Sequence, residues 1–318
     1  MITNKIQDAK EALDKDEIIG LPTETVYGLA GNIYCDQALE KIFSLKKRPF
    51  YNPLIVHIKS IDDVFKIAEN IPEKAIQLAN SFWPGPLTLI LNKQSHISPI
   101  ITADKPTVAV RVPNHPVALE LLRNIDYPLA APSANPFGSI SPTTSKHVQD
   151  YFGEELSVIL EGGSCLNGIE STIIGFENDS PIVYRLGAIS IEEIESIVGK
   201  VAINNHSESQ PTAPGMVSKH YSPRTRLILS ENVMEDVEKY NKMRIGVISL
   251  YQEMNHSSVI STEILSPTKN LYEAASKLYA AMHRLDKLKL EIIIAEVLPN
   301  NSVGKSINDR LQRAAKEQ

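Results

Sequence analysis

The chain has 318 residues, 42% hydrophobic and 22% charged, which is ordinary for a globular protein and long enough for two domains. Its net charge of −6 disfavours a dedicated nucleic-acid-binding protein, because such proteins carry a basic footprint. The two isolated cysteines, the polar N-terminus and the lack of any apolar run near the roughly 20 residues that span a bilayer predict a cytoplasmic protein without a disulfide framework, a metal-ligand cluster or a membrane segment.

Residues 1–198 alternate strand-like and helix-like patterns, which predicts an α/β domain around a large mixed sheet. A helix begins at Asp36, which we expect to cap it, and its apolar positions are spaced three and four apart. Further helices are expected at 72–82, 116–124 and 190–198. Runs rich in β-branched residues predict strands at 54–58, 87–91, 107–112, 158–160, 173–176 and 182–184.

Two polar stretches stand out in this domain. The first, 22–29, follows an apolar strand, and the second, 46–57, starts with three cations at the end of a predicted helix. Cations at that position offset the negative end of the helix dipole, which is the purely structural interpretation. Three in succession, stopped by Pro49 and followed by a strand, favour the interpretation that an anion is held there.

Small hydroxyls, an amide and arginines gather near the ends of other predicted strands. Any one of them is more often a turn residue than a ligand-binding residue, but ligand sites in open α/β sheets form at strand ends. Their accumulation predicts a pocket for a nucleotide and a small polar molecule, and no spacing suggests a Ser-His-Asp or Cys-His set. These residues are Thr107, Arg111, Ser133, Asn135, Ser141, Thr143, Ser171 and Arg185.

Residues 199–224 lack periodicity and are predicted to form a linker, although Met216, His220 and Tyr221 are unusual in a mere spacer. Residues 225–318 again alternate strands and helices, which predicts a small, Rossmann-like parallel α/β domain. Its strands are expected at 227–229, 245–250 and 292–296, and its helices at 233–241, 271–289 and 305–315.

Gly304-Lys305-Ser306 is similar to the end of a Walker phosphate-binding loop. The glycine that such a loop needs five residues earlier is Pro299 in this chain. An ordinary P-loop NTPase is therefore disfavoured.

Taken together, the motifs resemble those of the threonylcarbamoyl-AMP synthases in their long form, which has a YrdC-like domain and a C-terminal domain. The resemblance covers essentially the whole chain. It implies a YrdC-like catalytic domain at 1–198 with a twisted mixed sheet and a cavity, a linker or lid at 199–224 and a small domain at 225–318. The segments that carry it are 22–29, 46–57, 82–91, 108–113, 132–135, 141–143 and 168–173.

The resemblance also implies a reaction and its partners. The family joins L-threonine, bicarbonate or CO₂, and ATP into threonylcarbamoyl-adenylate and releases pyrophosphate. A separate complex then transfers the threonylcarbamoyl group to an adenosine of tRNA. Mg²⁺ held mainly by the ATP phosphates is the implied cofactor, and a weak contact with tRNA is an implied interaction.

The same resemblance assigns roles to residues, with Lys46 and Arg48 as the catalytic pair. The implied L-threonine-binding residues are Thr25, His57, Arg111, Ser133 and Ser171. The implied ATP-binding residues are Lys46, Arg48, Asn52, Thr107, Asn135, Ser141, Thr143, Arg185 and Tyr221.

In the long form the linker crosses the mouth of the cavity, so Met216, His220 and Tyr221 are expected to act as a lid. This chain departs from the family at 217–219, where a more basic and aromatic stretch is common, and at 303–306.

Two other functions remain open at this stage. An RNA-binding YrdC-like module would use the same cations on a phosphate backbone, and its binding would weaken steeply with salt. A carbamoyl-adenylating relative would react without regard to threonine.

Overall fold

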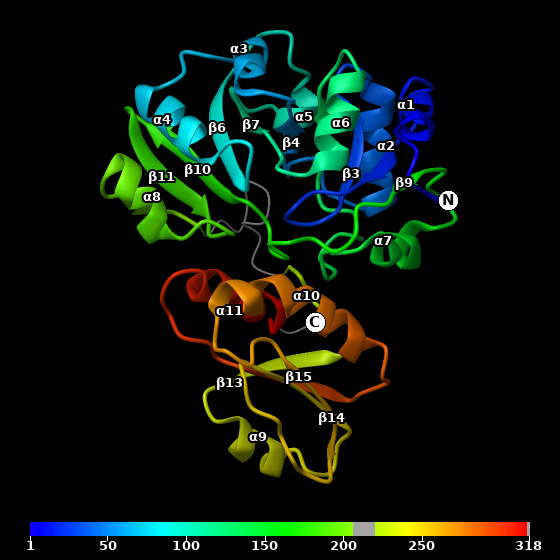
Figure 1. The fold of residues 1–318 in the computed structure, drawn as a ribbon, viewed down its shortest axis with the longest axis vertical. Helices are drawn as coiled ribbons and strands as arrows, with labels where there is room; N and C mark the ends of the chain where they lie inside the picture. The colour runs from blue at the N-terminus through cyan, green and yellow to red at the C-terminus, as the bar shows by residue number, and fades with distance from the viewer. Residues whose placement is uncertain (206–219, 317–318) are drawn as a thin grey trace.

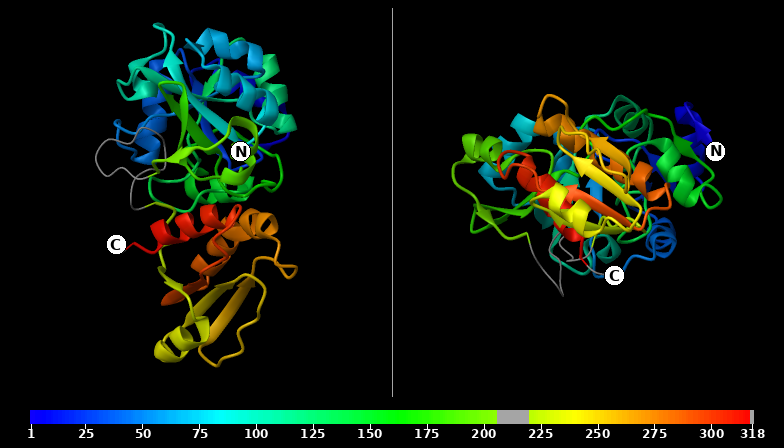
Figure 2. Two further views of the ribbon diagram at one scale, coloured as in Figure 1. Left: turned by 90° about the vertical axis from the view of Figure 1, so that its left-hand side faces the viewer. Right: turned by 90° about the horizontal axis from the view of Figure 1, so that it is seen from below.

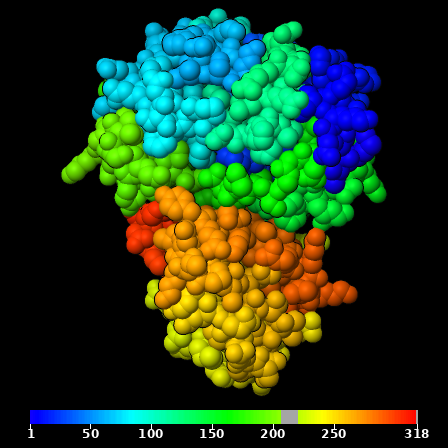
Figure 3. Space-filling model, viewed as in Figure 1, coloured from blue at the N-terminus to red at the C-terminus, as the bar shows by residue number. Residues whose placement is uncertain are grey.

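Two sheets form the framework of the protein, one in each of the lobes seen in Figures 1 and 3. The computed structural model describes residues 1–205 and 220–316. Within those residues the large sheet has twelve strands, in the order β1-β9-β2-β3-β8-β4-β7-β6-β10-β11-β12, with β5 paired to β6. Both parallel and antiparallel pairs occur along it, so the predicted mixed sheet is confirmed.

The strands of the large sheet are short, which is usual where both faces are covered. They are β1 (Ile2–Thr3), β2 (Ile19–Leu21), β3 (Gly28–Asn32), β4 (Ile55–His57), β5 (Ala68–Glu69), β6 (Leu87–Lys93), β7 (Thr107–Arg111), β8 (Leu129–Ala130), β9 (Ile159–Leu160), β10 (Thr172–Glu177), β11 (Ser180–Arg185) and β12 (Ala202–Ile203). β12 pairs with β11, so the sheet extends into the predicted linker.

Amphipathic helices cover this sheet and bury their apolar faces against it (Figure 1). The predicted helices at 72–82, 116–124 and 190–198 are confirmed, whereas 6–13 is a helix that the sequence patterns did not predict. The helices are α1 (Ile6–Leu13), α2 (Asp36–Lys46), the 3₁₀ turn η1 (Ile61–Asp63), α3 (Val64–Ile67), α4 (Glu73–Phe82), α5 (Pro99–Thr102), α6 (Pro116–Asn124), α7 (Ser145–Phe152) and α8 (Ile191–Val198).

The start of α2 differs from the prediction. Asp36 is the first helical residue rather than the cap, and the Cys35 sulfur accepts the hydrogen bond of the Ala38 backbone N–H at 3.4 Å. The Asp36 carboxylate instead accepts a hydrogen bond from Ser98, the N-cap residue of α5. An acidic residue in the first turn still stabilises the helix through its dipole.

The small domain is a parallel sheet in the order β13-β16-β14-β15, as predicted for a Rossmann-like unit. Its strands are β13 (Arg226–Ser230), β14 (Ile245–Ser249), β15 (Val259–Ile264) and β16 (Ile292–Glu296). Its helix α9 (Val233–Lys239) lies on one face, while α10 (Leu271–Asp286) and α11 (Gly304–Ala314) lie on the other. The strand β15 was not predicted, because its side chains are half exposed and carry no continuous apolar run.

The helices α10 and α11 lie between the small sheet and the large domain, as the two directions of view in Figures 1 and 2 agree. Their apolar side chains form one buried cluster with Val26, Ile140, Ile169 and Ala188 of the large domain. Gly168 allows the close approach, since its φ is +67° and a Cβ there would come within 2.5 Å of the Ser276 Cα in α10. The domains therefore share a hydrophobic core.

The Walker-like triplet has a structural place at this interface. Gly304 begins α11, where any Cβ would collide with the Pro299 carbonyl oxygen. Lys305 forms an ion pair with Glu192 at 2.7 Å, and the Ser306 hydroxyl donates to the Gly187 carbonyl at 2.8 Å. The triplet joins the two domains.

No helix within 1–205 and 220–316 combines the length and the apolar character that a bilayer crossing requires.

Candidate active site

A cavity opens at strand ends of the large sheet, the position at which ligand sites of α/β sheets form. The strand register brings its walls together, since His57 at the end of β4 pairs with Arg111 at the end of β7. The predicted site residues that line it are Thr25, Arg48, His57, Arg111, Ser133, Ser171, Arg185 and Tyr221. The others are Thr23, Val26, Gly28, Ile55, Ala131, Pro132, Glu170 and His220.

The cationic triplet at the end of α2 is divided by the backbone. Lys47 takes the left-handed conformation (φ 51°) that ends the helix, and its side chain is exposed. Lys46 and Arg48 on either side are buried, at 1% and 6% exposure. Two of the three cations are therefore turned inward, which the helix-dipole interpretation alone does not explain.

Asn52 fixes the Arg48 guanidinium. Arg48 donates from Nη2 to the Asn52 Oδ1 at 2.7 Å and to the Pro53 carbonyl at 2.8 Å, and from Nε to the Asn52 carbonyl at 3.1 Å. None of these partners is a carboxylate. Burial, followed by the nearby Arg185, lowers the pKa of Arg48 to about 9, so the group stays charged at neutral pH.

Lys46 lies beside the Ser133–Asn135 turn and donates to the carbonyl oxygens of Ser133 and Asn135, each at 2.5 Å. Burial, together with the charge of Arg48, holds the pKa of the Lys46 ammonium well below its usual range. The Asn135 amide nitrogen Nδ2 donates to the Ser139 carbonyl at 2.9 Å. The buried Asn135 Oδ1 has no hydrogen bond. Burial thus removes water from these cationic and polar groups, which costs free energy of folding.

Arg111 forms the opposite wall. Its Nη2 lies 2.7 Å from the Glu24 carboxylate, and it also donates to the Thr25 hydroxyl at 2.9 Å and to the Gly85 carbonyl at 3.2 Å. Both members of the ion pair are about 96% buried. Glu24 is therefore engaged as the partner of an arginine.

His57 is buried beside Arg111 and is a neutral imidazole at pH 7. Burial, followed by the Arg111 charge, lowers its pKa to about 3. Its Nδ1 lies 3.2 Å from the Ile55 carbonyl.

The entry to β10 and the end of β11 supply a third group. The Arg185 Nη2 donates to the Ser171 hydroxyl at 2.9 Å, and its Nε donates to the Ser171 carbonyl at 3.0 Å. Ser171 shares a further hydrogen bond with Thr88 at 2.7 Å. Burial lowers the pKa of Arg185.

Six predicted ATP-binding residues do not line the cavity, namely Lys46, Asn52, Thr107, Asn135, Ser141 and Thr143. Lys46 and Asn52 contact residues that do line it, Ser133 and Arg48. Ser141 lies behind Glu170, to which its hydroxyl donates at 2.6 Å, and Thr143 contacts His147 at the start of α7. Thr107 lies at the other end of β7 from Arg111, in a separate surface hollow beside Asn92 and Phe176. The structure therefore does not bring Thr107 to this site.

Residues 220–221 close the cavity. His220 packs edge-on against Phe137 at 5.8 Å and lies beside Tyr221, and both are almost completely buried. Tyr221 has a φ of 66°, an uncommon conformation for a tyrosine, and the next residue donates its N–H to the Gly138 carbonyl at 2.8 Å. The predicted lid residue Met216 and the stretch 217–219 lie outside the described residues.

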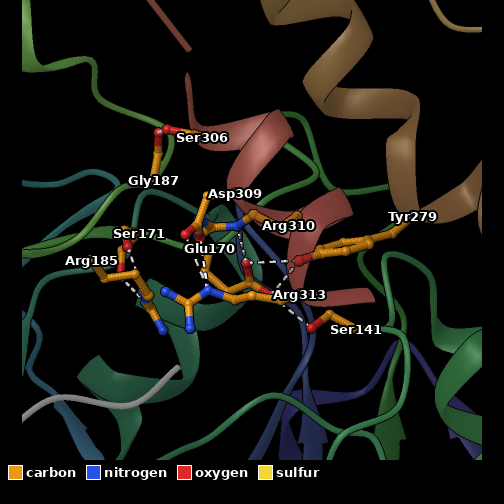
Figure 4. Close-up of polar contacts among 10 residues, drawn as sticks. All are labelled: Ser141, Glu170, Ser171, Arg185, Gly187, Tyr279, Ser306, Asp309, Arg310 and Arg313. Carbon is orange, nitrogen blue, oxygen red and sulfur yellow. Dashed lines mark hydrogen bonds and ion pairs between the residues drawn. The ribbon is translucent and has the colours of Figure 1, made fainter. Parts of the chain in front are cut away.

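Sequence reasoning missed Glu170 as part of the wall, although it precedes Ser171 in a segment that was singled out. It also missed every contact from the small domain. Arg310 in α11 donates to the Glu170 carboxylate at 3.2 Å and is completely buried (Figure 4). Its neighbours along the chain give no sign of this role, because only the docking of the two domains brings it to the cavity.

The site is thus a cationic cavity with fixed hydroxyls and amides. Of the two carboxylates near it, Glu24 is paired with Arg111 and Glu170 with Arg310. Across the described parts of the chain, no three His, Cys, Asp or Glu side chains gather as metal ligands do. Such a cavity suits polyanions and a carboxylate, and its chemistry is charge neutralisation and positioning.

Comparison with known proteins agrees with this chemistry. A family model described as "Telomere recombination" matches residues 11–187, and one described as "Threonylcarbamoyl-AMP synthase, C-terminal domain" matches residues 189–316. The threonylcarbamoyl-AMP synthase of Bacillus subtilis is 38% identical and covers 98% of this chain and 93% of its own. The threonylcarbamoyl-AMP synthase of Pyrococcus abyssi is 35% identical and covers 98% of this chain and 94% of its own.

Solved structures give the same result. The crystal structure of P. abyssi Sua5 complexed with L-threonine has a TM-score of 0.92 and 34% identity, covering 99% of this chain and 97% of that one. E. coli YciO, at 22% identity and a TM-score of 0.51 over 59% of this chain, shares the fold. The chain therefore belongs to the threonylcarbamoyl-AMP synthase family in its two-domain form, a family of nucleotidyltransferase-type enzymes.

Proposed function

We propose that this chain joins L-threonine, bicarbonate or CO₂, and ATP into threonylcarbamoyl-adenylate with release of pyrophosphate. The observation that carries the proposal is the pairing, within one cavity, of two kinds of cationic group. Arg48 and Arg185 lie near the lid residue His220, and Arg111 lies beside His57 and Thr25. The first group suits phosphates, and the second suits an amino-acid carboxylate.

In the proposed complex Lys46, Arg48 and Asn52 act on the phosphates, with Lys46 and Arg48 as the catalytic pair. Arg111 binds the threonine carboxylate, and its present partners, Glu24 and Thr25, hold the guanidinium in place. The remaining assignments to L-threonine are Thr25, His57, Ser133 and Ser171. The remaining assignments to ATP are Asn135, Ser141, Thr143, Arg185 and Tyr221.

The chemistry needs little more than this. The threonine amine takes up CO₂ as a carbamate, whose oxygen attacks the α-phosphorus while the α–β phosphoanhydride bond breaks and pyrophosphate leaves. A carbamate is a modest nucleophile, so the rate depends on alignment and on neutralising the negative charge of the two anions. Buried cations without carboxylate partners, such as Lys46 and Arg48, supply that charge without reorganisation.

Mg²⁺ fits this scheme as a companion of ATP rather than as a resident ion. Glu170 and Glu24 are both engaged by arginines and leave no free carboxylate set among the described residues. We propose that the phosphates hold the ion, which would neutralise charge on them.

Apolar groups in the cavity supply a basis for preferring threonine to serine. Val26 and Ile55 line it close to Thr25 and His57. A methyl group against such side chains contributes about 1 kcal/mol, or several-fold in specificity.

The test is pyrophosphate release from ATP, with and without L-threonine and bicarbonate. Lys46→Ala and Arg48→Ala should each lower the rate at least about 100-fold. The matched control is Lys47→Ala, since Lys47 stands between them and is exposed; its rate should stay within about twofold.

The alternatives give different outcomes in the same assay. Release indifferent to threonine would identify a carbamoyl-adenylating relative. No release, together with salt-sensitive RNA binding, would identify an RNA-binding module. Product from the wild type should serve a tRNA threonylcarbamoyl-transfer complex in the cytoplasm, and any direct contact with tRNA is expected to be weak.

A further inference from the structure

The cavity wall contains a carboxylate where a polyanion is expected to bind. Glu170 is 5% exposed and lines the cavity between Ser171 and the lid residues. An uncompensated carboxylate at that place would repel ATP phosphates strongly, because charges interact with little screening in a buried site. Something must therefore neutralise Glu170 before nucleotide binds.

The small domain provides the compensation. The Arg310 Nε donates to the Glu170 Oε2 at 3.2 Å, and the Tyr279 hydroxyl lies 3.0 and 3.1 Å from the two Glu170 oxygens. Ser141, of the large domain, donates to Oε1 at 2.6 Å. Figure 4 shows the three side chains converging on this one carboxylate. Two of its partners come from α10 and α11.

Arg310 also reaches the lid. Its guanidinium carbon lies 5.4 Å from the centre of the Tyr221 ring, and Tyr279 packs against the same ring at 5.7 Å. Arg310 is completely buried, its Nη1 lies 3.2 Å from Asp309, and its Nη2 has no hydrogen-bond partner. One arginine thus contacts both a wall residue and a lid residue of the cavity.

We propose that Arg310 is a positioning residue of the active site: it neutralises Glu170 and supports Tyr221, so the small domain makes the cavity competent for ATP. The inference rests on the proposed function, because it takes ATP as the anion. It assigns to the small domain an electrostatic task in addition to docking.

The test measures binding of α,β-methylene-ATP by titration calorimetry, independently of turnover. Arg310→Met should weaken this binding at least about tenfold, because Glu170 then keeps its hydrogen bonds from Tyr279 and Ser141 but loses its ion-pair partner. Adding Glu170→Gln to that variant should restore most of the affinity, since the repelling charge is then gone. Arg310→Lys keeps the charge but not the planar group that lies against Tyr221, so its affinity should fall between those of Arg310→Met and the wild type.

The matched control is Lys305→Met on the same helix. It removes another ion pair between the domains, the one between Lys305 and Glu192. Their side chains are 31% and 51% exposed, respectively. The affinity of Lys305→Met for α,β-methylene-ATP should match that of the wild type. The Arg310→Met variant should bind L-threonine with an affinity within about threefold of the wild type.

Equal affinity in Arg310→Met and Lys305→Met would overturn the proposal. So would a weakened Arg310→Met that Glu170→Gln does not rescue, because Arg310 would then serve docking alone. If Arg310→Met does not fold, Arg310→Lys and the double variant decide, and loss of binding in either as a folded protein overturns it. A wild type that binds no nucleotide would instead contradict the proposed function.

Discussion

In the large domain, buried polar groups gather around one cavity, whereas the small sheet is packed almost entirely with aliphatic side chains. Buried atoms without a hydrogen bond include Asn52 Nδ2, Asn135 Oδ1 and His220 Nδ1, all near the cavity, but in the small sheet only Ser230 Oγ among the described residues. On the far face of that sheet, Val247 and Ile294 pack in an aliphatic cluster.

This difference separates two uses of burial. An unpaired buried polar group costs stability, so a fold retains it where a ligand will complete its bonds. The aliphatic core of the small domain contributes stability only. The interface helices α10 and α11 belong to both categories, because their apolar faces dock and Arg310 binds the cavity-lining Glu170.

The largest effect is expected from a substitution of Arg111, a cavity residue of the large domain. Arg111→Ala removes the group assigned to the threonine carboxylate and leaves Glu24 as an unpaired buried charge. We expect kcat/KM for L-threonine to fall about 1000-fold, with binding of α,β-methylene-ATP changed far less. Steady-state pyrophosphate release at varied threonine measures the effect. Arg123→Ala, on the exposed face of α6, is the control, and an unchanged KM for threonine would refute the assignment.

Two matched isoleucine truncations test whether the two faces of the small sheet have different roles. Ile307→Ala in the interface cluster and Ile294→Ala in the far cluster each truncate a fully buried isoleucine. Each should lower the free energy of unfolding by about 3 kcal/mol in urea denaturation. Only Ile307→Ala should also raise the KM for ATP, because only that residue supports the contact with the cavity. An equal change in KM for both variants would show that the two faces are not distinct.

The pH dependence of ATP binding probes the buried lysine. The pKa of Lys46 is lowered in the free protein, and a bound polyphosphate would raise it again. Binding above the lowered pKa therefore takes up a proton, and affinity should fall as the pH rises, by at most about tenfold per pH unit.

Calorimetry in buffers of different ionisation enthalpy measures that proton. Lys46→Met should abolish the uptake. His220 is another titratable group that faces the same cations, and burial followed by Arg48 also lowers its pKa. Persistence of the full uptake in Lys46→Met would assign the proton to another group.

The smallest effect is expected at a surface contact between the domains. Lys287 and Asp150 form an ion pair at 2.7 Å, with side chains 54% and 34% exposed. Lys287→Met should change the free energy of unfolding by no more than about 0.5 kcal/mol and leave pyrophosphate release unaltered. A large loss of activity would mean that interface charges matter well beyond Arg310.

Much of this architecture could be predicted from local patterns. Periodicity predicted the helices at 73–82 and 116–124 and the strand at 55–57 within one or two residues, because apolar spacing is a local property. The patterns did not predict β15, because its half-exposed side chains form no apolar run. They also gave the wrong cap for α2, because the cap is the thiol of Cys35 rather than a carboxylate or hydroxyl side chain.

The sequence by itself determined the two-domain organisation and the polar motifs that line the cavity, among them Arg48, Arg111 and Ser171. These motifs lie at element ends, and both residue type and position can be read along the chain. Only the tertiary structure decided that Lys47 turns away, that Thr107 lies at the wrong end of β7 and that Arg310 reaches Glu170, 140 residues away. Such contacts depend on strand register and on the docking of two separately built surfaces, and neither is encoded in any local stretch of the chain.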